Sequence, residues 1–136
     1  MTLCDYTFEQ GFLHQWVFNE RSIAAFDEFE TKYEQIVRKL DKGETLYMLV
    51  DYRPAGMPPL RMMVDRIREI YKRIGRAPDD IRVAYVMTER DLQTMEPLNS
   101  AMLNKLPSGA SRRYFEEYNN AVLWLHTSHQ IRTGAV

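Results

Sequence analysis

Apolar side chains recur along two stretches of the chain at steps of three and four residues, which is the spacing of one face of an α-helix. The first stretch follows Ser22, whose hydroxyl suits a helix N-cap, and stops before Gly43. The second follows a pair of prolines and stops at Gly75. Two long amphipathic helices are therefore expected. Their predicted apolar faces are Phe26, Phe29, Tyr33, Ile36, Val37 and Leu40 in the first, and Leu60, Met63, Val64, Ile67, Ile70, Tyr71 and Ile74 in the second.

Short, continuous apolar runs predict strands that are covered on both faces, as in the middle of a parallel sheet. Leu46–Val50 is such a run, and residues 81–88 form a second one. Residues 111–118 offer a further short strand. Two β-prone runs flank Gly11 near the start of the chain. They predict an antiparallel hairpin in which Gly11 adopts the left-handed backbone of a tight turn.

Two further helices are expected, over residues 92–106 with an interruption at Pro97, and over residues 119–131 with Asn119 or Asn120 as N-cap. Strands that alternate with helices imply right-handed parallel crossovers. The sequence therefore predicts a single α/β domain over residues 1–136. It would hold a mixed, mostly parallel sheet of four to five strands, an N-terminal antiparallel hairpin and about four helices, and its tail is expected to fray from about residue 130.

Composition narrows the class of protein. The chain of 136 residues suits one domain, and 45% hydrophobic with 27% charged residues is typical of a soluble globular protein. A net charge of -1 gives no pull toward nucleic acid or an anionic membrane. Cys4 is the single cysteine, which fits a reducing cytoplasm. No signal peptide is recognisable, and no apolar run approaches the roughly 20 residues of a membrane span.

Three segments carry a resemblance to a known family. They are the hairpin with its long helix ending "KLDKGETLYMLVDY", the strand "IRVAYVMT" one helix later, and the ending "RYFEEYNNAVLWL". In order and spacing, residues 12–125 resemble the bacterial STAS-like family, also called SpoIIAA-like, whose fold some classifications group with the lipid-binding Sec14 type. The resemblance implies a small regulatory or binding domain, not an enzyme.

The family's phosphorylation switch is not matched. Members that act as anti-sigma antagonists carry a phosphorylatable serine in an Asp-Ser-x-Gly-like turn, where this chain reads "DYRPAG". Asp51 keeps the acid, but Tyr52 and Arg53 stand in place of the serine. From Leu46 to Met87 there is neither serine nor threonine. A switch that needs a hydroxyl acceptor therefore has none at the matching place.

The loops at residues 51–59 and 88–97 each follow a predicted central strand. In open α/β sheets, ligands bind outside the carboxyl ends of parallel strands, near the point where the strand order reverses. Prolines and Gly56 restrict the first loop, and a rigid loop presents side chains at low entropic cost. We expect the loops to lie side by side and to bind a protein partner first, or a small apolar ligand second. The expected residues are Asp51, Tyr52, Arg53, Thr88, Glu89 and Arg90, with Met57 and Met95 as an apolar floor.

If Tyr52 and Arg53 belong to such a surface, replacing both with alanine should leave the melting temperature nearly unchanged while it abolishes binding. The alternative is that Arg53 simply pairs with Asp51 or Glu89. Asp51, Glu89 and Asp91 could also serve acid–base chemistry. No nucleophile stands beside them in a recognisable arrangement, and G-x-S-x-G, G-x-G-x-x-G and Walker motifs are missing from the sequence. A non-enzymatic protein is therefore expected, and a small hydrolase or isomerase using Asp51 and Arg53 is the alternative.

The remaining side chains bear on metal binding, nucleic-acid binding and self-association. His126 and His129 could hold zinc only with help from Cys4 or His14, so surface histidines without metal or cofactor are expected. The basic second helix has no interleaved aromatic residues for stacking bases, so we expect a solvated face and no nucleic acid. We expect a homodimer, the commonest assembly. Its expected interface is the hairpin (Phe12, Trp16, Phe18) or the methionine-rich segments (Met57, Met62, Met63, Met87, Met95, Met102).

Overall fold

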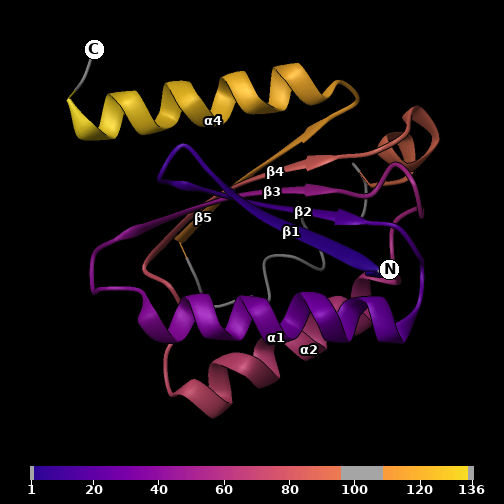
Figure 1. Ribbon diagram of the computed structural model, residues 1–136, viewed down its shortest axis with the longest axis horizontal. Helices are drawn as coiled ribbons and strands as arrows, with labels where there is room; N and C mark the ends of the chain where they lie inside the picture. The colour runs from indigo at the N-terminus through magenta and orange to yellow at the C-terminus, as the bar shows by residue number, and fades with distance from the viewer. Residues whose placement is uncertain (1, 96–108, 135–136) are drawn as a thin grey trace.

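The computed structural model of the protein describes residues 2–95 and 109–134. These residues form a five-stranded mixed sheet with helices on both of its faces, which confirms the predicted α/β fold (Figure 1). Residues 89–95 are also helical. The strands are β1 (Cys4–Glu9), β2 (Leu13–Phe18), β3 (Thr45–Asp51), β4 (Asp80–Val86) and β5 (Gly109–Phe115), and the helices are α1 (Ile23–Lys39), α2 (Leu60–Ile74) and α4 (Tyr118–Thr133).

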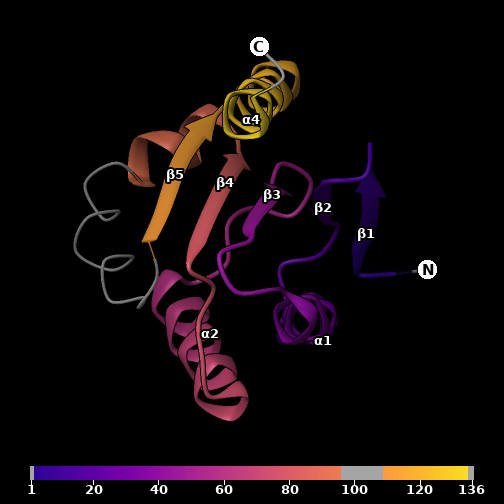
Figure 2. The same ribbon diagram turned by 90° about the vertical axis from the view of Figure 1, so that its left-hand side faces the viewer.

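The order of the strands across the sheet is their order along the chain. β1 pairs with β2 in the antiparallel sense, and every later pair is parallel. Crossovers of one hand that always step in the same direction place their helices on the same face of the sheet, so α1 and α2 lie together. The helix α4, which follows the last strand, lies on the opposite face (Figure 2). The strand order of this sheet nowhere reverses, so the carboxyl ends of β3 and β4 do not lie beside such a reversal.

Local sequence signals explain most of the element ends. Gln10 and Gly11 have φ of 54° and 76°, which is the left-handed pair of a type I′ hairpin turn. The Ser22 hydroxyl accepts a 3.1 Å hydrogen bond from the Ala25 amide, as expected of an N-cap. Gly75 closes α2 with φ of 86°, and its amide donates to the Tyr71 carbonyl.

The last helix differs from expectation at its start. α4 has Glu117 as N-cap, without a side-chain capping bond, so the expectation of Asn119 or Asn120 is wrong. The chain turns directly after β5, and both asparagines already lie in the first helical turn. At its other end α4 continues to Thr133, where Gly134 closes it in the left-handed conformation.

The larger core lies between the sheet and the α1–α2 pair, and it contains the predicted stripe of the first helix. Phe26, Phe29, Tyr33 and Leu40 are buried, and Ile36 packs against them half-buried. The run Leu46–Val50 is buried on both faces, as a central strand requires. A smaller core lies beneath α4 and is made by Leu13, Tyr47, Leu49, Ala84, Val86, Ala121 and Leu125.

Most of the described side chains expected at a dimer interface are inside the molecule. Trp16 and Phe18 are 0% and 2% exposed in the larger core. Phe12 is half-buried, and its ring stacks on His129 at a centroid distance of 3.9 Å. Of the methionines, Met63, Met87 and Met95 are buried, Met57 and Met62 are half-buried, and Met102 lies outside the described residues. Among the described residues, neither the hairpin positions nor the methionines expected at an interface offer a broad apolar surface.

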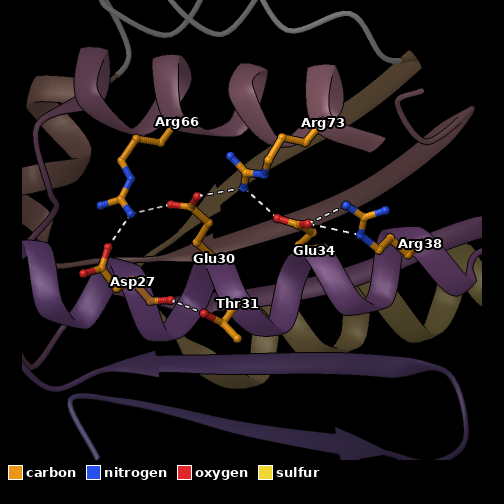
Figure 3. Close-up of polar contacts among 7 residues, drawn as sticks. All are labelled: Asp27, Glu30, Thr31, Glu34, Arg38, Arg66 and Arg73. Carbon is orange, nitrogen blue, oxygen red and sulfur yellow. Dashed lines mark hydrogen bonds and ion pairs between the residues drawn. The ribbon is translucent and has the colours of Figure 1, made fainter. Parts of the chain in front are cut away.

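An ion-pair network joins α1 to α2 (Figure 3). Arg66 contacts both Asp27 and Glu30, and Arg73 contacts Glu30 at 3.2 Å and Glu34 at 2.6 Å. Glu30 therefore bridges both arginines, and its side chain is only 15% exposed. Side-chain hydrogen bonds from Arg73 lower the pKa of Glu34. These two arginines of the second helix therefore link α2 to α1 through ion pairs.

Candidate functional site

The loops after β3 and β4 lie side by side, as expected. The Tyr52 amide donates a 2.8 Å hydrogen bond to the Val86 carbonyl, which extends the pairing of β3 with β4. Further along, the Met57 amide donates to the Asp91 carboxylate at 3.3 Å. We call Asp51, Arg53, Met57, Thr88, Glu89 and Arg90 the carboxyl-end surface.

Asp51 and Arg53 form the most ordered part of this surface. Asp51 ends β3 and is 5% exposed. Its carboxylate accepts three hydrogen bonds from Arg53, from the amide and Nε at 3.0 Å each and from Nη2 at 2.8 Å. These bonds raise the pKa of the Arg53 guanidinium. The Arg53 side chain remains 40% exposed. A buried acid therefore fixes the direction of an exposed guanidinium.

The loop that carries Arg53 is fixed at several points. Its Gly56 has φ of +85°, and the Gly56 amide donates a 2.8 Å hydrogen bond to the Tyr52 carbonyl. A side chain at this position would be strained by the backbone conformation. Arg21, which precedes α1, donates from Nε to the Met57 carbonyl at 2.8 Å. Sequence reasoning missed Arg21, because nothing local indicates a contact with a loop 36 residues away.

Two of the predicted residues do not lie on this surface. Tyr52 is 2% exposed, its ring stacks on Tyr85 with an interplanar angle of 11°, and its hydroxyl lies 3.2 Å from the Met63 sulfur. Burial raises the pKa of Tyr52 well above its usual range. Met95 is 2% exposed within the larger core. Neither side chain forms the cleft or the floor assigned to it.

The alternation of side chains along a strand explains the position of Tyr52. Met48 and Val50 point to the larger core, and Tyr52 continues that set at every second residue. Asp51 points to the other face of the sheet. Of the remaining predicted residues, Thr88, Glu89 and Arg90 are exposed and Met57 is half-buried, so these stay on the carboxyl-end surface.

The turn from β5 to α4 also reaches this surface, which the sequence reasoning did not anticipate. The Met87 amide donates a 3.0 Å hydrogen bond to the Phe115 carbonyl, so the ends of β4 and β5 are adjacent. Glu117 and Tyr118 lie close enough to Arg53 to raise its pKa further. The available signal was the acidic pair in "RYFEEY", directly after the last predicted strand.

A small cavity lies deeper, between the sheet and the α1–α2 pair. Its lining includes Tyr33, Tyr52, Tyr71, Tyr85 and Arg112, and it encloses about 30 Å³. The Tyr33 and Tyr71 hydroxyls are 2.6 Å apart, and burial raises the pKa of Tyr71 to about 12, so both phenols are neutral. A cavity of this volume accommodates a water molecule but no metabolite. We therefore assign it to the core and not to a metabolite site.

A wider hollow of about 400 Å³ lies at the opposite edge, at the amino ends of β2 and β3. Phe12, Tyr47 and His129 line it, and His129 also meets the Tyr47 ring edge-on at 5.3 Å. His126 packs edge-on against the Phe12 ring. Both histidines of the zinc hypothesis thus contact aromatic rings. Within residues 2–95 and 109–134, no group of three or more His, Cys, Asp and Glu side chains is placed to hold a metal ion.

His14 lines the same hollow, and its environment predicts that the free energy of unfolding depends on pH. Its Nδ1 lies 2.7 Å from the Tyr6 hydroxyl, and burial, assisted by the Lys32 ammonium, lowers the pKa of His14 to about 4. The unfolded chain takes up this proton near pH 6.5, so the stabilisation is complete above that pH and is lost as the pH falls toward about 4. Allowing for partial exposure, the free energy of unfolding should fall by about 1 kcal/mol between about pH 7 and pH 5 through His14 alone.

Urea titrations of the wild type and of His14→Asn at both pH values test this expectation. Every other titrating group is shared by the two proteins, so their difference isolates His14. The variant should lose less stability than the wild type on acidification. Equal losses would show that His14 does not contribute.

Comparisons of the chain with protein-family models, with curated proteins and with solved structures find no match. In the part of the chain that the structure describes, no helix is both long enough and apolar enough to cross a membrane.

Proposed function

We propose that this chain is a non-enzymatic, cytoplasmic binding domain of STAS-like type that captures a protein partner through its carboxyl-end surface. The observation that carries the proposal is the exposed Arg53 guanidinium, held in place by a buried carboxylate on a loop that is itself fixed. The single cysteine, Cys4, is buried and unpaired, which is consistent with a reducing compartment.

An immobilised arginine is well suited to protein recognition. Arginine is among the residues that dominate binding energies at interfaces, and its planar fork matches a carboxylate. Asp51 already restricts the rotamers of Arg53, so less side-chain entropy is lost when a partner binds. Glu89 and Arg90, on the loop after β4, are exposed and of opposite charge. This mixed surface favours a protein segment that brings an acidic side chain to Arg53.

The two alternatives are weaker on the same geometry. An enzyme would need an Asp51 oxygen within reach of a substrate, but both oxygens accept hydrogen bonds from Arg53. A small apolar ligand would need an apolar floor. Met95 is in the core, and Met57 is half-buried, so little apolar surface remains there.

Replacing Arg53 with lysine should abolish capture of the partner. Lysine keeps a positive charge beside Asp51 but loses the fork, so we expect affinity to fall at least about tenfold with little loss of stability. Alanine is avoided at this position because it would leave the buried Asp51 carboxylate unpaired. The matched control is Arg68→Lys, an exposed arginine on α2.

The measurement is capture from a cell lysate by the immobilised full chain, quantified by mass spectrometry, followed by titration of the purified partner. The supporting result is a protein retained by the wild type and by Arg68→Lys but lost with Arg53→Lys. Retention of the same proteins by all three, or retention of none, would contradict the proposal.

A further inference from the structure

Arg112 lies on the face of β5 that is turned to the larger core. Its partner on the neighbouring strand is Val83, a core residue, and the Arg112 side chain is half-buried. Among residues 2–95 and 109–134, no carboxylate forms an ion pair with Arg112. A guanidinium in such surroundings loses part of its hydration, and without a counterion this loss is not offset.

The cavity of about 30 Å³ that Arg112 lines is rich in hydrogen-bond donors. Tyr33 on α1, Tyr71 on α2 and Tyr85 on β4 contribute their phenols to the same lining. The Tyr85 hydroxyl accepts a hydrogen bond from Arg112, so its own hydrogen remains to be donated. The Tyr33 and Tyr71 hydroxyls are 2.6 Å apart, and since only one of them donates to the other, a second hydrogen remains. The guanidinium and two hydroxyl hydrogens are therefore available to an occupant.

None of the described lining residues balances the charge of Arg112. The lining that the structure describes contains no acid. Burial raises the pKa of Tyr71 to about 12 and that of Tyr33 well above its usual range, so neither phenol ionises near neutral pH. Burial also raises the pKa of Tyr85, although the charge and the hydrogen bond of Arg112 oppose this effect. Neutral phenols donate hydrogen bonds but are not counterions.

A water molecule would satisfy this lining poorly. Water brings two hydrogens of its own, which need acceptors. The rest of the described lining is apolar except for Tyr52, whose hydroxyl donates to the Met63 sulfur. A monatomic anion only accepts hydrogen bonds, and it also compensates the guanidinium charge. A chloride ion is only slightly larger than a water molecule, whereas phosphate and sulfate carry four oxygens and are too large for this cavity.

We propose that this cavity is a binding site for a monatomic anion, chloride, held by the Arg112 guanidinium and by the hydroxyls of Tyr85 and of the Tyr33–Tyr71 pair. These groups come from β5, β4, α1 and α2, so the bound ion joins both helices to the sheet. The site lies in the larger core and needs no protein partner. It is therefore independent of the function proposed for the carboxyl-end surface.

Thermal unfolding of the full chain tests whether chloride binds the folded state. A ligand that binds only the folded chain raises its melting temperature. Gluconate is too large for the cavity, so about 200 mM sodium gluconate serves as the reference for about 200 mM sodium chloride. The change from gluconate to chloride should raise the melting temperature of the wild type by at least about 3 °C more than that of Arg112→Met. Methionine keeps an apolar side chain but loses the charge and the donors.

Arg113→Met is the matched control. Arg113 is the next residue of β5, but it lies on the opposite face of the sheet over the rings of Phe115 and Trp124. This variant should respond to chloride as the wild type does. An equal response of Arg112→Met and the wild type, or a wild type that does not distinguish chloride from gluconate, would overturn the proposal.

Tyr85→Phe is a second variant that decides the question if Arg112→Met does not fold. It keeps the ring that stacks on Tyr52 and removes one donor to the ion. Chloride titrations of the melting temperature should show an affinity at least about tenfold lower than that of the wild type. An unchanged affinity would show that the Tyr85 hydroxyl does not contact chloride and would contradict the site as described.

Crystals of the full chain grown with sodium bromide locate the ion, because bromide scatters anomalously and chloride sites accept it. An anomalous peak is expected within hydrogen-bonding distance of Arg112 and Tyr85. A cavity that holds water, or no ordered atom, would overturn the proposal. A bromide peak without any chloride response in solution would mean binding at crystal concentration only, and it would also overturn the proposal.

Discussion

Replacement of Phe29 with alanine should lower the free energy of unfolding by about 3–5 kcal/mol. Phe29 is 4% exposed, and its ring lies 5.0 Å from that of Trp16 and 5.5 Å from the stacked ring of Tyr33. Removing it takes away the buried apolar area and leaves a cavity that rigid aromatic neighbours on β2 and α1 cannot close. Both terms destabilise the fold.

Urea unfolding followed by far-UV circular dichroism measures this loss, with an unchanged slope as evidence that both proteins unfold to the same state. Phe8→Ala is the matched control, because Phe8 is 52% exposed and its removal leaves little cavity. The control should lose less than about 1 kcal/mol. A loss for Phe29→Ala no larger than that of the control would contradict the assignment of Phe29 to the core.

Much of the fold follows from the sequence because burial imposes a period on it. The helix stripe from Phe26 to Leu40 and the run Leu46–Val50 repeat at the spacings that packing on one or both faces requires. Ser22 and Gly75 were predictable for a local reason, since each satisfies backbone groups at a helix end. These features depend on a few neighbouring residues, and a single sequence displays them.

Contacts between distant residues were not predictable in the same way. Nothing in the sequence around Glu30 indicates that it bridges two arginines of α2, and nothing around Arg21 indicates a bond to Met57. The hairpin aromatics were misassigned because an alternating strand shows that one face is apolar but not what covers it. α1 covers Trp16 and Phe18, where a second copy was expected.

The candidate site was predicted in part, for reasons that differ from residue to residue. Asp51 and Arg53 were found because they end a buried strand, where functional side chains of α/β proteins gather. The pairing of Arg53 with Asp51, which the sequence also allowed, is present. Tyr52 was misplaced because both faces of β3 are covered by apolar side chains. Such a pattern does not show on which face of the sheet the next side chain lies. Glu117 was overlooked because only the tertiary structure shows that β5 lies next to β4.

The position of Tyr52 reverses one expectation. Replacing Tyr52 and Arg53 together with alanine was expected to leave the melting temperature nearly unchanged. The burial of Tyr52 now predicts that Tyr52→Ala alone costs about 3–5 kcal/mol, since a large aromatic ring is lost from beneath the surface. Loss of binding in the double variant would therefore report unfolding as much as a lost contact.

Tyr52→Phe separates these two effects. It keeps the ring that stacks on Tyr85 and removes only a hydroxyl whose partner, the Met63 sulfur, is a weak acceptor. The expected loss is less than about 1 kcal/mol, and capture of the partner should equal that of the wild type, because the phenol does not reach the carboxyl-end surface. Thermal unfolding and the capture assay on Tyr52→Ala and Tyr52→Phe give the two readouts. Loss of capture by a fully stable Tyr52→Phe would place the hydroxyl at the binding surface and contradict the arrangement described for it.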